Sequence, residues 1–390
     1  MKNPYLCSMK IVLAFDSFKG CLSAQEVCRA AKDGILSVRK DAEVVSVPLS
    51  DGGEGLVQCF LRMGKAREVS VKVHGPLMEE VEATYAISHD GEIAYMEMAS
   101  ACGLTLVPEE RRNVMDATTY GLGEMMVDAW ERGVKRIVLG IGGSATCDAG
   151  MGMLEALKSQ HFLSGDTSKR VLPQPLNRHR RHRLTDIDDI DQPTSTTSVL
   201  TVACDVDNPL FGELGAAHVF APQKGATPEQ VEMLDRRLRA FAMATEEKGV
   251  ALPEDAFYPG VGAAGGLGYA LLTYLGAELK SGIEVVMEAC GFDEALRGAD
   301  MVLTGEGCSD CQTLYGKVAA GVLRKAKEQG VKTVLMSGQV KEKEALMAGG
   351  FGRLMCVNEG DGRPLEVLML PEVARENIRR TCQRLMEDFR

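Results

Sequence analysis

The sequence lacks any apolar stretch of 18 or more residues, which excludes the usual pattern of a membrane-spanning helix. The opening MKNPYLCSMK is not followed by the apolar core of a secretory signal peptide. An excess of positive charge is also missing, because 44 Lys and Arg stand against 55 Asp and Glu, a net charge of -11. We therefore expect a cytoplasmic protein that binds neither membranes nor nucleic acid, with its 12 cysteines mostly as free thiols.

Several common catalytic signatures are absent as well. Gly316-Lys317 is followed by Val318 and lacks the spacing of a Walker A loop, and no clean G-x-G-x-x-G follows a predicted strand. The six histidines are scattered, and none sits in a nucleophile pattern such as G-x-S-x-G, which argues against acyl-transfer hydrolysis. Cys308 and Cys311 form a C-x-x-C that could be a redox pair or half of a zinc site, but no second Cys or His pair completes the zinc site.

The patterning that is present predicts an α/β protein with more than one domain, since 390 residues exceed the size of a single core. Apolar runs at 11–14, 43–48, 301–304, 332–336 and 353–357 alternate with helical patterns and predict a parallel, doubly wound, Rossmann-like sheet. Ser23 and Glu26 have the spacing of a capping box at a helix start. Runs at 68–73, 81–87 and 92–98 have short connections, and His89-Asp90-Gly91 predicts a hairpin turn.

These patterns predict two domains. Residues 1–68 and 285–390 would form the discontinuous Rossmann-like domain, and residues 69–284 an inserted mixed α/β domain. Residues 159–198 contain prolines, a basic run and an acidic run, and we expect a flexible surface loop there whose charges neutralise each other.

Glycine-rich polar loops follow several predicted strands, where open α/β sheets bind their ligands. They are DSFKG (16–20), SDGGEG (50–55), GIGGSATCD (140–148), GVGAAGGLG (260–268) and TGEG with the residues up to 312. Glycine allows backbone N–H groups to approach an anion closely, so each loop is a candidate cradle for phosphate or carboxylate.

Three charged side chains are the candidates for chemistry. Lys19 lies in a loop that follows a predicted strand and could place a cation against phosphate, although a solvated surface lysine is the alternative. Asp205 and Asp207 follow the predicted strand 199–204 and could hold Mg²⁺ or act as a general base. Capping of the turn before Pro209 is an equally good explanation of this pair.

Taken together and in order, these loops resemble the bacterial type I glycerate kinase family. The resemblance rests on KIVLAFDSFKG, PLSDGGEG, GPL, TTYGLGE, GIGGSATCDAG, VACDVDNPL, FAPQKGAT, GAAGGLG, TGEG, DCQT and GK, which span nearly the whole chain. It implies a Rossmann-like domain built from both chain ends, an inserted α/β domain, ATP and Mg²⁺ as co-substrates, and D-glycerate as the acceptor. Family members commonly form 2-phosphoglycerate; 3-phosphoglycerate stays open here, as does the choice between a monomer and a homodimer.

The resemblance also implies a set of site residues. The catalytic candidates are Lys19, Asp205 and Asp207, with the two aspartates also as candidate Mg²⁺ ligands. The substrate- or phosphate-binding candidates are Asp16, Ser17, Asp51, Gly52, Gly53, Glu54, Gly142, Gly143, Ser144, Asp148, Asn208, Gly265, Gly266, Glu306, Asp310, Gln312 and Lys317. Within this set we expect Lys19 to bind phosphate or the glycerate carboxylate and the Gly265 loop to bind the nucleotide phosphates.

The chain departs from the family pattern at a few positions. Cys308, Ser309 and Cys311 stand where the family usually has Arg, Leu and Gly, and Cys147 stands where Asn is commoner. Two other functions compete with a kinase. One is a sensor that binds glycerate or nucleotide without turnover, and the other is a dinucleotide-dependent oxidoreductase, against which the missing fingerprint argues.

Overall fold

The structure is a computed structural model that describes residues 9–50, 55–159, 199–315 and 318–388. The chain divides into two compact units, Met1–Asp51 with Val286–Arg390, and Gly52–Val285. The first unit is discontinuous, and the second is inserted into it. The α/β class predicted from the sequence is confirmed, since the five-stranded sheet is wholly parallel and the six-stranded sheet mixes parallel with antiparallel pairs.

The first crossing between the units precedes α2 (Leu56–Arg62), whereas the sequence places it near residue 68. The ring of Phe60 on α2 stacks on Tyr95 of β5 (Ile93–Glu97), with 3.7 Å between ring centroids. This contact attaches α2 to the inserted sheet. The second crossing falls between Val285 and Val286, and residues 160–198 of the predicted loop lie outside the described residues.

The discontinuous unit contains a five-stranded parallel sheet in the order β13-β11-β9-β1-β2. Its strands are β1 (Lys10–Phe15), β2 (Glu43–Ser46), β9 (Met301–Gly305), β11 (Lys332–Ser337) and β13 (Arg353–Cys356). The chain runs from β1 to β2 on one side and from β9 through β11 to β13 on the other. Ligands of such doubly wound sheets bind beyond the carboxyl ends of the two strands at which the order reverses, here β1 and β9.

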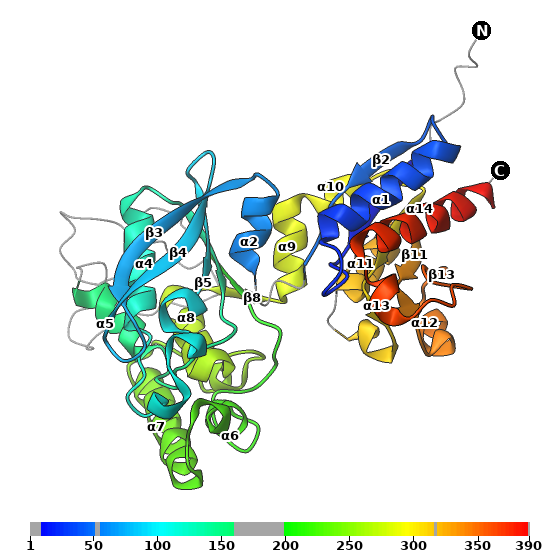
Figure 1. Ribbon diagram of the computed structural model, residues 1–390. Helices are drawn as coiled ribbons and strands as arrows, with labels where there is room; N and C mark the ends of the chain where they lie inside the picture. Colours follow the sequence, from blue (N-terminus) through cyan, green and yellow to red (C-terminus); the bar gives the residue numbers. More distant parts are fainter. Residues whose placement is uncertain (1–8, 51–54, 160–198, 316–317, 389–390) are drawn as a thin grey trace. The chain divides into compact units, whose positions relative to one another are not determined.

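Helices cover both faces of this sheet. α1 (Ala24–Val38) and α14 (Pro371–Glu387) lie side by side on one face (Figure 1) and share a core with β1, β9 and β11. α11 (Val318–Glu328) and α12 (Lys343–Gly349) pack on the other face. Smaller elements of the unit are α10 (Phe292–Leu296), β10 (Cys308–Ser309), η5 (Cys311–Leu314), β12 (Gln339–Val340) and α13 (Leu365–Leu368).

The predicted capping box at the start of α1 is confirmed. The Ser23 hydroxyl accepts the backbone N–H of Glu26, and the Glu26 carboxylate accepts the backbone N–H of Ser23. This hydrogen bond from Ser23, followed by one from Arg375, lowers the pKa of Glu26 to about 2. The helix therefore begins at the residue that the sequence indicates.

The inserted unit has a six-stranded sheet in the order β3-β4-β5-β6-β7-β8. Its remaining strands are β3 (Ala66–His74), β4 (Glu80–Ser88), β6 (Arg136–Gly140), β7 (Val199–Ala203) and β8 (Glu278–Lys280). β4 pairs antiparallel with β5 across the predicted turn, while β5 to β8 are parallel. Its α-helices besides α2 are α3 (Ala99–Cys102), α4 (Tyr120–Glu131), α5 (Met151–Ser159), α6 (Ala216–Phe220), α7 (Pro228–Glu247), α8 (Ala263–Leu275) and α9 (Gly282–Cys290), which continues past the crossing.

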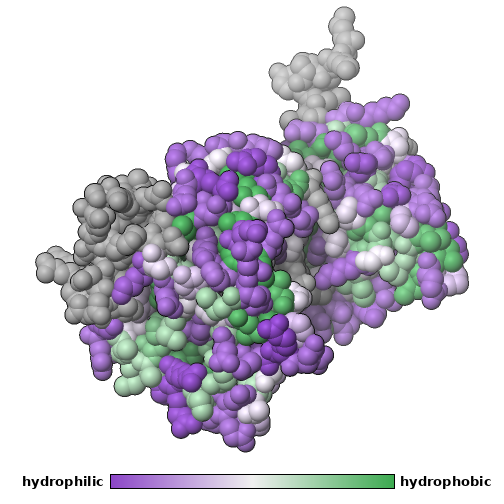
Figure 2. Space-filling model, turned by 60° about the vertical axis from the view of Figure 1, so that its left-hand side comes forward, coloured by the Kyte–Doolittle hydropathy of each residue, from purple (hydrophilic) through white to green (hydrophobic). Residues whose placement is uncertain are grey.

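In the described part of the chain, no helix has both the length and the apolar character needed to cross a bilayer. The face drawn in Figure 2 is mainly hydrophilic, with smaller hydrophobic patches between the polar areas.

Gly34 shows how closely the two ends of the chain pack. A Cβ at this buried position of α1 would lie 2.4 Å from the carbonyl oxygen of Arg379 and 2.8 Å from Cβ of Cys382, both on α14. Gly34→Ala should therefore lower the free energy of unfolding by about 1–3 kcal/mol, although alanine is the better helix former. Urea denaturation would measure this, with Asp33→Ala on the exposed side of the same helix as a control that should cause no loss.

Candidate functional site

The loops after β1 and β9 meet at the switch point of the discontinuous unit. The backbone N–H of Asp16 donates to the carbonyl of Gly305 at 3.0 Å. Asp16 and Ser17 are half-buried, and the Asp16 carboxylate accepts the Ser17 N–H at 2.6 Å. Lys19 is exposed in the same loop. A cation is thus available at the end of β1, beside the end of β9.

Glu306 follows β9 and is held by its neighbours. Its Oε1 accepts hydrogen bonds from Thr313 Oγ1 at 2.7 Å and Ser309 Oγ at 3.3 Å, and its N–H donates to Ser337 Oγ at 3.3 Å. A Cβ on the preceding Gly305 would lie 1.8 Å from the carbonyl oxygen of Met336, so only glycine fits there. The Glu306 carboxylate is therefore half-buried and oriented.

Asp310 begins η5. Its carboxylate accepts the Gln312 N–H at 2.9 Å, and its own N–H donates to Thr313 Oγ1 at 3.1 Å. Asp310 thus has a capping role, and Gln312 remains exposed at the surface. Among the predicted residues, Asp51, Gly52, Gly53, Glu54 and Lys317 lie outside the described residues.

In the inserted unit, the carboxyl ends of β5, β6 and β7 lie side by side, because Glu97 pairs with Gly140 and Gly140 with Ala203. After β6 the chain forms an exposed turn at Gly142 and Gly143, and Gly143 has the left-handed φ of +72°. Exposed glycines in such a turn leave their backbone open to a ligand.

Lys224 braces this turn from inside the protein. Its side chain is 3% exposed, and its Nζ donates to Ser144 Oγ and to the carbonyl of Thr146, each at 2.7 Å. Burial lowers the pKa of Lys224 to about 8, although the nearby Cys147 and Asp148 act in the opposite direction. Within the candidate set, Ser144 is therefore a buried hydroxyl that connects the glycine turn to an interior cation.

Asp148 fastens the far end of the same loop. Its Oδ2 accepts the backbone N–H and the hydroxyl of Thr119, at 2.9 and 2.8 Å, and the N–H of Gly152 at 3.1 Å. Its Oδ1 accepts the N–H of Gly150 at 3.1 Å. These bonds satisfy donors at the start of α5 and tie that helix to the start of α4.

Gly265 and Gly266 are buried and pack against the protein's own loop. Both have left-handed φ values, as has Ala264 before them. A Cβ on Gly265 would lie 2.2 Å from the carbonyl oxygen of Thr146, and Ala149 N–H donates to the Gly265 carbonyl at 3.0 Å. The close approach that glycine permits here is therefore made to the segment 146–149.

Asp205 and Asp207 are exposed beyond the end of β7. Asp205 Oδ1 accepts the N–H of Gly282 at 2.7 Å, which places its negative charge at the start of α9. Asn208 Nδ2 donates to the carbonyl of Leu214 at 2.8 Å, and the Asn208 carbonyl accepts the N–H of Gly262 at 2.9 Å. The chain after Asp207 is thus fixed to the Gly262 segment.

Sequence reasoning missed Lys224 and Glu97. Glu97 Oε1 accepts the N–H of Gly55 at 2.7 Å and of Leu56 at 3.3 Å, so it holds the start of α2. For Glu97, the one available signal was its charge at the end of an otherwise apolar strand. Lys224 lies in the run FAPQKGAT, but no spacing rule distinguishes it from a surface lysine.

No three His, Cys, Asp or Glu side chains of the described residues form a cluster suited to a metal.

The pKa of Lys224 predicts a pH-dependent contribution to stability. The folded value is about 8 against an ordinary 10.5, so between these pH values the unfolded chain binds more protons at this position. The contribution of Lys224 to the free energy of unfolding should therefore rise with pH across this window. Relative to Lys224→Met, the wild type should gain about 1–3 kcal/mol between pH 8 and 10, measured by urea denaturation. A difference that stays constant with pH would contradict the prediction.

Comparison with known proteins identifies the family of this chain. The glycerate kinase family model matches residues 11–390. The chain is 43% identical to a glycerate kinase of Halalkalibacterium halodurans over 85% of both chains, and 42% identical to glycerate 2-kinase of Escherichia coli over 86% of both. A solved structure from Salmonella typhimurium, assigned as glycerate kinase 2, superimposes with a TM-score of 0.76 at 36% identity over 98% of both chains. The chain therefore belongs to the glycerate kinase family.

Proposed function

We propose that this protein is an ATP-dependent glycerate kinase that transfers the γ-phosphoryl group of ATP to a hydroxyl of D-glycerate. The observation that carries this proposal is the family match over residues 11–390, together with glycerate kinases at 41–43% identity over 85% or more of their length. Because the Escherichia coli relative is named glycerate 2-kinase, we propose 2-phosphoglycerate as the product.

The reaction needs positive charge against the phosphates and a group that accepts the hydroxyl proton. In the proposed mechanism, the glycerate hydroxyl oxygen attacks the γ-phosphorus, the bond to the ADP oxygen breaks, and the hydroxyl proton passes to a carboxylate of Asp205 or Asp207. Lys19, exposed at the switch point, supplies the cation for phosphate or for the glycerate carboxylate.

The glycine turn after β6 supplies backbone donors in this proposal. Gly142 and Gly143 are exposed, and the Gly143 carbonyl is already bonded to the Leu104 N–H at 2.9 Å, which fixes the turn. Lys224 keeps Ser144 and Thr146 in place beneath it. A preorganised turn stabilises developing negative charge without reorganising during the reaction.

The residues present fit Mg²⁺ in the form that kinases use. Mg²⁺ is usually held by one or two carboxylates together with substrate phosphates and water, and not by a cage of protein ligands alone. The exposed carboxylates of Asp205 and Asp207 meet that need, and the described residues contain no larger acidic cluster suited to a metal. When bound, Mg²⁺ would neutralise charge on the phosphate oxygens.

Turnover should be confined to D-glycerate when ADP release is followed with Mg·ATP and D-glycerate, L-glycerate, lactate or glycolate as acceptor. NMR of the product would show whether the 2- or the 3-hydroxyl carries the phosphate. Tight binding of glycerate without ADP release from folded protein would favour the sensor, and saturable quenching of NADH fluorescence would favour the oxidoreductase.

Asp205→Asn and Asp207→Asn should each lower kcat at least about tenfold, because each variant loses a carboxylate that would either accept the hydroxyl proton or hold Mg²⁺. Asparagine keeps an oxygen that can accept the Gly282 N–H, so the start of α9 should remain intact. Asp41→Asn, at an exposed carboxylate paired with Arg39, is the matched control and should leave kcat unchanged. Near-normal turnover in both site variants would remove these aspartates from the mechanism.

A further inference from the structure

Cys308 and Cys311 are not used by the proposed mechanism, yet they lie in the loop that carries Glu306 and Asp310. Both are free and partly exposed. Cys308 belongs to β10, which pairs with β12 so that Cys308 lies opposite Gln339. Cys311 is the first residue of η5. The two cysteines thus flank a short loop at the carboxyl end of β9.

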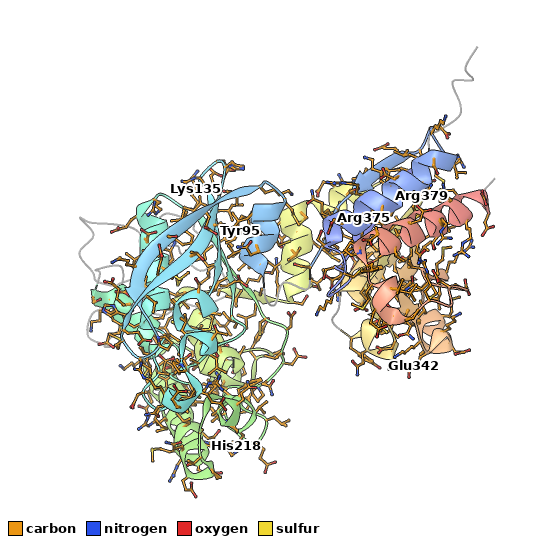
Figure 3. All side chains as sticks on the ribbon, viewed as in Figure 1. Tyr95, Lys135, His218, Glu342, Arg375 and Arg379 are labelled. Carbon is orange, nitrogen blue, oxygen red and sulfur yellow. The ribbon has the colours of Figure 1, made fainter. Side chains whose placement is uncertain are left out.

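Both cysteines contact one neighbouring segment, residues 339–342. The Cys308 thiol donates to Gln339 Oε1 at 3.7 Å. The Cys311 backbone N–H donates to Glu342 Oε2 at 2.8 Å, and the same carboxylate accepts a hydrogen bond from the Cys311 thiol. Figure 3 shows Glu342 at the start of α12. Each sulfur therefore has its own oxygen partner on the same neighbouring segment, residues 339–342.

We propose that Cys308 and Cys311 form a reversible disulfide that regulates the proposed kinase activity, with a low-molecular-weight disulfide as the oxidant. The regulatory part of this proposal rests on the proposed function, whereas formation of the disulfide does not depend on it.

The disulfide forms in two steps. A thiolate of Cys308 attacks one sulfur of the oxidant and releases one small thiolate. The Cys311 thiol then loses its proton and attacks the Cys308 sulfur, which forms the protein disulfide and releases the second small thiol. Two cysteines are oxidised, and one oxidant disulfide is reduced.

The order of these two attacks follows from Glu342. The hydrogen bond to this carboxylate raises the pKa of the Cys311 thiol, and burial and the charges of Glu342 and Asp310 add to the effect. Since the thiolate is the nucleophile, Cys311 reacts slowly and is suited to the second step. Removing the Glu342 charge should therefore speed closure of the disulfide.

Closure would disturb the site because the sulfurs must leave their present partners. Ser309, between the cysteines, is fully buried and connects to Ser337 Oγ at 2.8 Å and to Glu306 at 3.3 Å. Asp310 caps η5 next to Cys311. A covalent bond from Cys308 to Cys311 pulls on this loop from both ends, so the orientation of Glu306 depends on the reduced state.

The test begins with reduced protein and glutathione disulfide, followed by proteolysis and mass spectrometry of the peptide that contains both cysteines. The wild type should give a peptide lighter by two hydrogens, and Cys308→Ser and Cys311→Ser should not. Glu342→Gln should close the bond several-fold faster, while Glu344→Gln, an exposed carboxylate on the same helix, should match the wild type. If only mixed disulfides with glutathione form, the pairing of Cys308 with Cys311 is wrong. If Glu342→Gln closes the disulfide at the rate of the wild type, the role assigned to Glu342 is wrong.

Activity is measured on the same samples. Oxidation should lower kcat/KM of the wild type about tenfold through displacement of the loop, and dithiothreitol should restore it, while both serine variants stay insensitive. A disulfide formed without loss of turnover would overturn the regulatory role. An inactive reduced wild type would refute the proposed kinase function, and the mass measurement would still decide whether the disulfide forms.

Discussion

The parallel pairing of β1 with β9 is the constraint on which the discontinuous unit depends. It joins residues 11–15 to residues 301–305, so the whole inserted unit lies, in the sequence, between two strands that are neighbours in space. The strands are apolar on both faces, and residues 11–15 are fully buried, as expected for a parallel sheet covered by helices on each side. The same pairing brings Asp16 next to Gly305 and so creates the switch point where Lys19 and Glu306 are found.

A second constraint is the buried ammonium group of Lys224. Removing a charged group from water is costly unless hydrogen bonds compensate, and here two acceptors at 2.7 Å offset part of the cost. The lowered pKa of Lys224 shows that compensation is incomplete. The buried charge of Lys224 therefore lowers the free energy of unfolding at neutral pH, while its hydrogen bonds hold the Gly142–Gly143 turn rigidly in place. A site whose supporting groups are less favourable than ordinary core residues is typical of functional loops.

Glycines serve two physical roles in this chain. At Gly143 an exposed turn leaves the backbone open, which suits an anion. At Gly121, Gly265 and Gly305 the missing side chain allows the chain to approach its own carbonyl groups, at positions where a Cβ would lie 1.8 to 2.2 Å from an oxygen. Glycine-rich loops with similar sequences can therefore either present their backbone to a ligand or pack inside the protein. Burial separates the two cases.

The sequence by itself determined the α/β class, most strand positions, the helix start at Ser23, the β4–β5 hairpin and the family, because these depend on local periodicity, turn chemistry and ordered motifs. Only the tertiary structure decided which polar residues support others. Lys224 lies 80 residues from Ser144, Glu97 about forty residues from the helix start it holds, and Asp148 contacts Thr119, the residue before α4. It also decided that Gly265 packs against residues 146–149 and that α2 belongs to the inserted unit. Such contacts depend on desolvation and on distances between segments far apart in the chain, and local sequence patterns contain neither.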